Sequence, residues 1–292
     1  EPMANRNVIS NPTCQNCEAA FPIYDSDVVF YDKICVPKPT FCPECRMIRR
    51  TMWRNMRSLH RRVCDICNKT LISMYKDDEV PVHCQECSNS TNWDPKEYEK
   101  EYDQNVPFLK QVHTLFKEVP RLYRYVTGTV IDSEYTNYTA NNNKAYLSYS
   151  VIGCENVAYS DTIDGSKNSM DCLSVRKVDL CYWNVDGEGN YNSQFLIQSQ
   201  NCIDSKFLFD CVNCQNCFLS SNLRNQSYVF KNKKLSKEEY EEAILEYKLN
   251  TFSGLEKARI ELKEMIEDVA IHRYAQIYSA QNSFGENISN SK

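Results

Sequence analysis

The fold of the first third of this chain is decided by four short segments, which read CQNC at residues 14–17, CPEC at 42–45, CDIC at 64–67 and CQEC at 84–87. A two-residue gap lets one tight turn present two sulfur atoms to the same ion, and a second such turn completes a tetrahedral zinc site. The segments therefore predict two structural Zn²⁺ ions per chain. The predicted ligands are Cys14, Cys17, Cys42 and Cys45 in the first site, and Cys64, Cys67, Cys84 and Cys87 in the second.

Both sets consist of a Cys-x-x-Cys turn, a short β-rich segment and a second pair, and in the first set a helical pattern begins at the second pair. This order is typical of a treble-clef fold. Disulfides are the alternative, but disulfide scaffolds are typical of short secreted chains. This chain of 292 residues has no secretory leader pattern near its start and no apolar run of about 18 residues. We therefore expect a cytoplasmic protein that does not enter a membrane. Four thiolates leave no open coordination position, so catalysis by a zinc-bound water is disfavoured.

The segment from Arg46 to Val63 predicts an amphipathic helix that starts at the second cysteine pair. Its apolar residues recur at steps of three and four: Ile48, Met52, Met56, Leu59 and Val63. Arginines recur at similar steps, displaced by roughly 200° around the helix, and no acidic residue neutralises them. This pattern predicts a face that binds the backbone of RNA or DNA. The basic residues of the segment that we assign to it are Arg46, Arg49, Arg50, Arg54, Arg57, Arg61 and Arg62.

Charge and glycine content exclude several classes of function. The net charge is −5 although the zinc region is basic, which argues against uniform coating of nucleic acid but permits a local basic surface. With 7 glycines, the chain lacks glycine-rich phosphate loops, and it has no GxSxG nucleophile segment. An HNH-type nuclease needs clustered histidines, and the zinc region has only His60 and His83.

Composition and periodicity divide the chain into five segments. We predict tandem zinc modules over 1–92, a helical linker over 93–134, a β-solenoid over 135–233, a helical cap or insertion over 234–280, and further repeats or a disordered tail over 281–292. The predicted fold class is multidomain and mainly β with helices. Because the chain starts at Glu1 rather than Met, we expect a fragment or a processed chain, with further coils beyond Lys292.

Helices are predicted on both sides of the solenoid. Asp94, Pro95 and Glu97 form an N-terminal capping pattern. A second helix runs from Pro107 to Glu118, and its buried side is expected to hold Phe108, Val112, Leu115, Phe116 and Val119. Near the C-terminus, capping boxes at Ser236 to Glu239 and Ser253 to Glu256 predict two more helices, the second of about 25 residues.

Short β-rich segments separated by Asn, Ser, Asp and Gly fill the middle of the chain and recur about every 10 to 13 residues. Two such segments make a period of about 22 to 25 residues, which is the length of one coil of a parallel β-helix. The segment contains seven cysteines: Cys154, Cys172, Cys181, Cys202, Cys211, Cys214 and Cys217. The last three have the spacing of a third metal site, but no compact fourth ligand is evident. We therefore expect these cysteines to fill stacked inward positions, and Cys35 likewise to be buried.

The first zinc segment carries a resemblance to known proteins. Phe30-Tyr31-Asp32-Lys33, Pro37, Pro39 and residues 41–50 (FCPECRMIRR) are similar to a zinc-ribbon or treble-clef family. The whole order of segments resembles uncharacterised zinc-binding proteins of candidate-phyla bacteria, in which two such modules precede an Asn/Cys/Tyr-rich repeat and a Leu-Ser-Lys-Glu-Glu-Tyr segment, here Leu235 to Tyr240. The resemblance implies zinc binding and a β-solenoid, and it implies no established activity.

These patterns predict a non-enzymatic zinc-binding protein that binds nucleic acid through the Arg-rich segment. The alternative is a protein-interaction scaffold, in which the solenoid holds a partner and the arginines face an acidic surface. A distant third hypothesis is a carbohydrate-active enzyme that uses paired carboxylates on the solenoid. The acidic residues that cluster there are Asp161, Asp164, Asp171, Asp179, Asp186 and Glu188.

Overall fold

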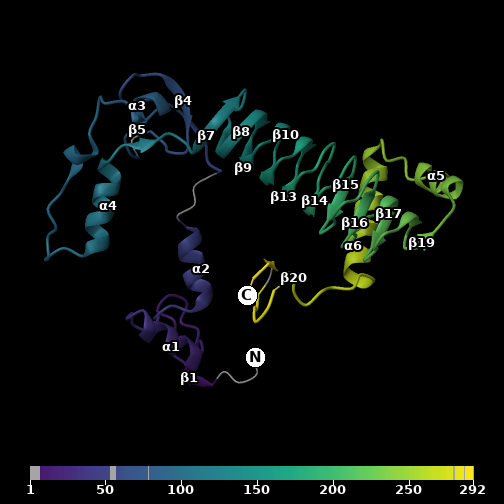
Figure 1. Ribbon diagram of the computed structural model, residues 1–292, viewed down its shortest axis with the longest axis horizontal. Helices are drawn as coiled ribbons and strands as arrows, with labels where there is room; N and C mark the ends of the chain where they lie inside the picture. Colours follow the sequence, from purple (N-terminus) through teal and green to yellow (C-terminus); the bar gives the residue numbers. More distant parts are fainter. Residues whose placement is uncertain (1–6, 53–56, 78, 279, 286, 292) are drawn as a thin grey trace. The chain divides into compact units, whose positions relative to one another are not determined.

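The computed structural model describes residues 7–52, 57–77, 79–278, 280–285 and 287–291. The fold is mainly β with helices, and a parallel β-solenoid follows two four-cysteine modules, as predicted (Figure 1). The chain divides into two compact units: unit 1 joins 1–55 with 272–292, and unit 2 spans 56–271. This division places the two cysteine sets in different units. Among the described residues, no helix combines the length and the apolar character needed to span a bilayer.

Unit 1 is small and has its core at the first cysteine set. Its elements are β1 (Val8–Ser10), β2 (Ile23–Tyr24), α1 (Asp25–Lys33), α2 (Pro43–Thr51), β20 (Ile277–Tyr278) and β21 (Ile288–Ser289). Strands β1 and β2 pair antiparallel, and β20 and β21 pair parallel. Phe21 and Ile23 are buried beside the cysteines. The expectation that Cys35 is buried is wrong: this residue ends the α1 region in a left-handed conformation and is exposed.

Unit 2 begins with a hairpin and a few short elements around the second cysteine set. These elements are β3 (His60–Val63), β4 (Thr70–Ser73), β5 (Val82–His83), α3 (Gln85–Ser88), a 3₁₀ helix η2 (Pro95–Tyr98), α4 (Phe108–Glu118) and β6 (Arg121–Leu122). Strands β3 and β4 pair antiparallel, and β5 pairs parallel with β6. Helix α4 has the predicted bounds, but none of its residues is buried, so the prediction of a buried side is wrong.

The predicted continuous helix from Arg46 to Val63 is also wrong. Helix α2 ends at Thr51, and His60 to Val63 form β3. Residues 53–56, including Arg54, lie outside the described residues. The physical reason is a tertiary contact. Strand β3 leads into the turn that carries Cys64 and Cys67 and pairs with β4, and this pairing overrides the local helical periodicity.

The solenoid is a stack of short parallel strands that runs from Val126 to Phe230 (teal to green in Figure 1). Its strands are β7 (Val126–Ile131), β8 (Thr136–Tyr146), β9 (Ser148–Ile152), β10 (Glu155–Ala158), β11 (Asp161–Asp164), β12 (Lys167–Met170), β13 (Leu173–Arg176), β14 (Val185–Glu188), β15 (Gln194–Ile197), β16 (Lys206–Phe209), β17 (Gln215–Ser221) and β18 (Ser227–Phe230). Glu155 pairs with Lys167 in the next coil, so one coil has 12 residues. The predicted period of about 22 to 25 residues is therefore wrong, because it counted two coils as one. The antiparallel strand β19 (Lys233–Lys234) closes the stack.

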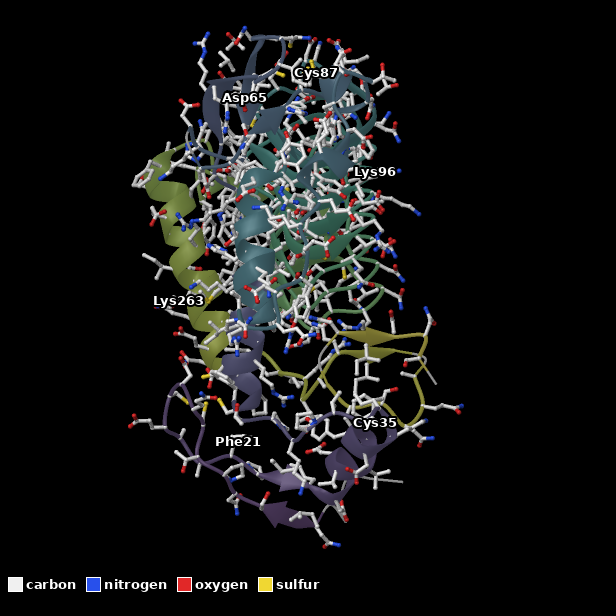
Figure 2. The ribbon with its side chains drawn as sticks, turned by 90° about the vertical axis from the view of Figure 1, so that its left-hand side faces the viewer. Phe21, Cys35, Asp65, Cys87, Lys96 and Lys263 are labelled. Atoms are coloured by element: carbon white, nitrogen blue, oxygen red, sulfur yellow. The ribbon has the colours of Figure 1, made fainter. Side chains whose placement is uncertain are left out.

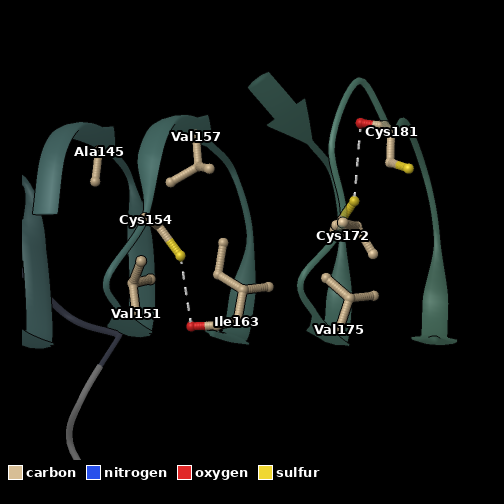
Figure 3. Close-up of a cluster of buried hydrophobic side chains, with 9 residues drawn as sticks. Ala145, Val151, Cys154, Val157, Ile163, Cys172, Val175 and Cys181 are labelled. Carbon is tan, nitrogen blue, oxygen red and sulfur yellow. Dashed lines mark hydrogen bonds between the residues drawn. The ribbon is translucent and has the colours of Figure 1, made fainter. Parts of the chain in front are cut away.

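Within each coil the backbone repeats every three residues. Every third residue from Tyr138 to Lys231 has a positive φ, and from Thr139 to Ser220 the residue that follows it is buried. Figure 3 shows such inward side chains, among them Val151, Val157 and Ile163, packed in the narrow interior of neighbouring coils. Because a coil of this length encloses little space, its inward positions hold mainly Ser, Cys, Val and Asn.

The inward polar side chains accept hydrogen bonds from backbone amides of the next coil, in place of bonds between strands. Ser160 Oγ accepts the amide of Cys172 over 3.1 Å and donates to the carbonyl of Ala158 over 2.8 Å. Asn190 Oδ1 accepts the amide of Cys202, again one coil onward, over 2.9 Å. A buried amide without a partner is costly, so this pattern explains why the core accepts so many polar residues.

Two helices cover one edge of the C-terminal coils. Helix α5 (Lys237–Leu245) begins at Ser236, whose hydroxyl accepts the amide of Glu239 over 3.2 Å, as the predicted capping box requires. Helix α6 (Phe252–Asp268) begins after Thr251 instead of Ser253, so the second predicted capping box is wrong, and α6 has 17 residues. Thr251 Oγ1 accepts the Gly254 amide and caps the helix two residues earlier.

Candidate metal centres

The first cysteine set joins a turn to the start of a helix within unit 1. Cys14 and Cys17 lie on a turn that is closed by the amide of Glu18, which donates to the Cys14 carbonyl over 3.0 Å. Glu18 has a φ of 60°, as this tight turn requires. Cys42 is the N-cap residue of α2, and its Sγ accepts the amide of Cys45 over 3.4 Å. The turn and the helix start thus present two sulfur atoms each.

The second set has the same local construction in unit 2. The amide of Asn68, whose φ is 58°, donates to the Cys64 carbonyl over 2.9 Å and closes the turn that carries Cys67. Cys84 is the N-cap residue of α3, and its Sγ accepts the amide of Cys87 over 3.4 Å. Figure 2 labels Cys87 in this module.

The sulfur atoms of each set have the spacing of a tetrahedral metal site. All four lie within 4.8 Å of one another in both sets. The Sγ atoms of Cys17 and Cys42 are 3.8 Å apart, and so are those of Cys67 and Cys84. A tetrahedron with metal–sulfur bonds of about 2.3 Å has edges of about 3.8 Å. Both sets therefore suit a four-coordinate metal ion.

Backbone amides favour the thiolate form at both sites. The amide of Cys42 donates to Cys14 Sγ and the amide of Cys84 donates to Cys64 Sγ, each over 3.3 Å. Burial opposes ionisation of Cys14 and Cys64, but the backbone amides prevail and lower the pKa of each thiol to about 6. Thiolate is the form that binds a metal ion, so these amides favour metal binding by Cys14 and Cys64.

The predicted arginines divide between the two units, and several of them contact residues of their own unit. In unit 1, Arg46 Nη1 donates to the Tyr31 hydroxyl over 3.2 Å, and the Arg49 guanidinium lies 4.4 Å from the centre of the Phe41 ring. Arg50 is exposed on α2. Two of the three arginines on α2 thus contact aromatic residues of their own unit.

The arginines of unit 2 have other roles. Arg57 forms an ion pair with Asp161 at 2.5 Å, and Arg61 is exposed on β3. Arg62 is buried, and its Nη2 lies 3.0 Å from the Asp65 carboxylate. The residue therefore stabilises the second module instead of facing a ligand.

The solenoid cysteines fill the core, as predicted. Cys202, Cys211, Cys214 and Cys217 are buried in one cluster with Leu196 and other inward residues. The Sγ atom of Cys211 donates to the Phe209 carbonyl over 3.4 Å, a bond that Ser makes elsewhere in the stack. In the part of the chain that the structure describes, the groups of three or more close metal-ligand atoms are the two four-cysteine sets.

The solenoid carries a candidate functional surface that the sequence did not predict. We call it the open edge: Tyr135, Tyr146, Tyr159, Met170, Leu173 and Tyr182, all exposed on the N-terminal coils. Tyr146, Met170 and Tyr182 share one column with the buried Ala158, whereas Tyr159 and Leu173 belong to neighbouring columns. In the next coils this column holds the polar residues Gln194 and Lys206, and it reaches the core that α6 covers at Phe218. The signal was present as aromatic residues spaced by 12 or 13, but it becomes visible only with the correct coil length.

Comparisons with known proteins do not assign the chain to a family. No protein-family model matches it, and no curated protein does either. What the molecule can do therefore follows from its own residues, which form two closed four-cysteine sites and a solenoid with one partly covered apolar edge.

Proposed function

We propose that this protein is a non-enzymatic interaction scaffold, in which two Zn²⁺ ions stabilise the modules and the open edge binds an amphipathic helix of a partner. The observation that carries the proposal is that α6 covers one solenoid edge on the C-terminal coils but leaves it exposed on the N-terminal coils. On the C-terminal coils the side chain of Phe207 is fully buried beneath α6. On the N-terminal coils Tyr146 and Tyr159 are 46% and 54% exposed.

Zinc is the metal that the donor set favours. Four thiolates in a tetrahedral arrangement are typical of structural zinc, with iron as the other common occupant. Elemental analysis of the reduced protein should give two zinc ions per chain. Stoichiometric iron with a visible absorption band would contradict the assignment, and so would a folded, reduced protein without metal.

Helix α6 shows how an amphipathic helix fits this edge. Ala258 and Leu262 are buried against Phe195, Phe207 and Phe218. At the margin an ion pair of 2.7 Å joins Lys231 of the solenoid to Glu261 of the helix. The open edge presents tyrosine rings that are interrupted by Ala158 and Asp171, and tyrosine tolerates both water and an apolar partner.

A synthetic peptide with the sequence of residues 251–269 tests the proposal, because α6 already packs on the equivalent edge. We expect labelled peptide to bind the zinc-loaded protein, and Tyr159→Asp to weaken binding by roughly tenfold or more. Ile152→Asp is the matched control, since Ile152 is exposed on a different column of the solenoid. Equal binding to the parent and Tyr159→Asp, or no binding to the parent, would contradict the proposal.

Nucleic-acid binding stays a second candidate for unit 1 alone. Within the described residues no carboxylate forms an ion pair with Arg46, Arg49 or Arg50, so α2 carries uncompensated charge. Binding of random oligonucleotides should then weaken steeply with salt, and Arg49→Glu/Arg50→Glu should reduce the salt slope by about two. A salt slope that is unchanged in this variant would remove the candidate.

A further inference from the structure

A cavity beside the second cysteine set has a charged lining that the proposed function does not use. The β3–β4 hairpin, the start of α3 and the residues on either side of β7 line it, all within unit 2. Its volume of about 530 Å³ falls in the range of small-molecule sites, which is about 300 to 1,000 Å³. The charged residues of its lining are Arg61, Lys69, Glu86, Arg124 and Glu134, and Tyr135 also lines it.

Arg124 is a buried cation without a carboxylate partner. The residue is 7% exposed, and within the described part of the chain no carboxylate forms an ion pair with it. Its Nη1 donates to the carbonyls of Ser133 and Thr136 over 3.0 and 2.9 Å, and its Nε is buried without a hydrogen-bond partner. Carbonyl groups carry no net charge, so they leave the guanidinium charge uncompensated, whereas buried charges are normally paired. An anion in the cavity that Arg124 lines would supply the missing countercharge.

The other charged residues of the lining add to this positive charge. Arg61 is exposed on β3 and forms no ion pair among the described residues. Lys69 Nζ lies 3.7 Å from the Glu86 carboxylate, and both side chains are exposed. Glu134 is the second carboxylate of the lining, so three cations face two acidic groups and the balance is positive. A cavity lined by an excess of one charge concentrates ligands of the opposite charge, which here are anions.

We propose that this cavity binds a nucleotide, whose phosphate pairs with Arg61 and Arg124 and whose base stacks on Tyr135. Guanidinium groups bind phosphate oxygens through paired hydrogen bonds, and a phosphate carries enough charge to compensate two of them. Tyr135 is 42% exposed, and aromatic side chains stack on bases of any sequence. The inference goes beyond the proposed function, because the cavity is a different site from the open edge and shares only Tyr135 with it.

The test is the binding of adenosine monophosphate (AMP) to the zinc-loaded full chain, measured by isothermal titration calorimetry. We expect AMP to bind, and adenosine and inorganic phosphate each to bind at least about tenfold more weakly, because each lacks one of the two contacts. Arg61→Ala should weaken AMP binding by about tenfold and leave the fold intact, since the side chain is exposed. Arg50→Ala is the matched control, because Arg50 is an exposed arginine of unit 1 and should not affect AMP binding.

Two further variants separate the base contact and the open edge. Tyr135→Ala should weaken AMP binding but leave the binding of inorganic phosphate unchanged. Tyr159→Asp changes the open edge outside the cavity, so it should bind AMP like the parent even where it loses the α6 peptide. A parent that does not bind AMP, equal losses in Arg61→Ala and Arg50→Ala, or inorganic phosphate that binds as tightly as AMP would overturn the inference. A random oligonucleotide that binds where AMP does not would overturn it as well.

Discussion

In the first module the amide of Cys42 donates to Cys14 Sγ over 3.3 Å, and in the second the amide of Cys84 donates to Cys64 Sγ over the same distance. The turns also match, because Glu18 and Asn68 occupy the same left-handed position. Two segments whose sequences share only the cysteines and a few adjacent residues thus adopt the same backbone structure around the metal site. Its hydrogen bonds are donated by the backbone, so they depend on cysteine spacing more than on other side chains.

The surroundings of the two modules differ. The buried core of the first module consists of Cys14, Cys42 and Cys45 with Phe21 and Ile23, so cysteine ligands make up most of it. In the second module, Leu71, Val80 and Val82 are buried beside the ligands, and Tyr123 packs against them. The first module therefore depends more on its metal than the second does.

The second module is also tied to the solenoid. The amide of Met74 donates to the Tyr123 carbonyl over 2.9 Å, and Asn137 Nδ2 lies 3.4 Å from the Met74 sulfur. Both contacts lie within unit 2. The comparison thus predicts that damage to the second module spreads into the first coils, whereas damage to the first module stays local.

Removal of the metal should have the largest effect. A structural zinc site contributes about 10 to 16 kcal/mol in small peptides, more than the remaining core of either module can replace. With excess chelator, amide protection should be lost over residues 14–45 and 64–87 and lowered in β6 and β7, while the rest of the solenoid ladder stays protected. Hydrogen exchange with mass spectrometry checks this outcome. Unchanged protection of both modules in metal-free protein would refute a structural role for the metal.

Single ligand substitutions should separate the two modules. Cys14→Ser should abolish protection in the first module and leave the thermal unfolding of the solenoid unchanged. Cys64→Ser should also lower the protection of β6 and β7, because β5 pairs with β6 and Tyr123 bonds Met74. Calorimetry and hydrogen exchange on the two variants measure the difference. If Cys14→Ser lowers the solenoid transition as much as Cys64→Ser does, the asymmetry is not real.

A smaller effect should follow from Arg62→Ala, which removes a feature of the second module only. Arg62 Nη1 donates to the carbonyls of Lys76 and Val80 over 2.8 and 3.2 Å, and Nη2 contacts Asp65. Asp65, labelled in Figure 2, is partly exposed, so solvent screens much of the ion pair and the carbonyls carry most of the cost. We expect a loss of about 2 kcal/mol in the free energy of unfolding, measured with urea.

The neighbouring Arg61 provides the control for this prediction. Arg61 is exposed on the same strand, so Arg61→Ala should change the free energy of unfolding by less than about 0.5 kcal/mol. Equal losses for the two variants would show that Arg62 does not stabilise the module through its buried contacts.

The two metal sites could be predicted from the sequence because four cysteine ligands arranged as two Cys-x-x-Cys pairs have a specific spacing. Cys14 to Cys45 and Cys64 to Cys87 each contain two pairs, and the structure brings each set together. The periodicity of Arg46 to Val63 was less specific. Steps of three and four also occur when a helix ends at Thr51 and a strand starts at His60, and only the pairing of β3 with β4 reveals it.

The solenoid shows what a local pattern can and cannot predict. Its existence followed from the loss of helical periodicity, but its coil length did not, because templates with periods of 2 and 3.6 do not detect a period of 3. Ser166, Ser169, Cys172, Val175 and Val178 carry that period and all point inward. For α4, amphipathicity showed that one side needs a cover but could not show what provides it.

The smallest predicted effect concerns Asn16, whose side chain bonds a ligand sulfur in the first module. Asn16 Nδ2 donates to Cys45 Sγ over 3.4 Å, and Ile66 stands at the corresponding place in the second module, where it packs against the core. Groups that bond a metal ligand typically change metal affinity by about 10-fold or more when removed. Asn16→Ala should therefore weaken zinc binding at the first site by about 10-fold, while Ile66→Ala should lower the stability of the second module with little direct effect on its metal. Competition with a chromophoric chelator measures both affinities. Equal zinc affinities in the two variants would mean that the Asn16 bond does not distinguish the sites.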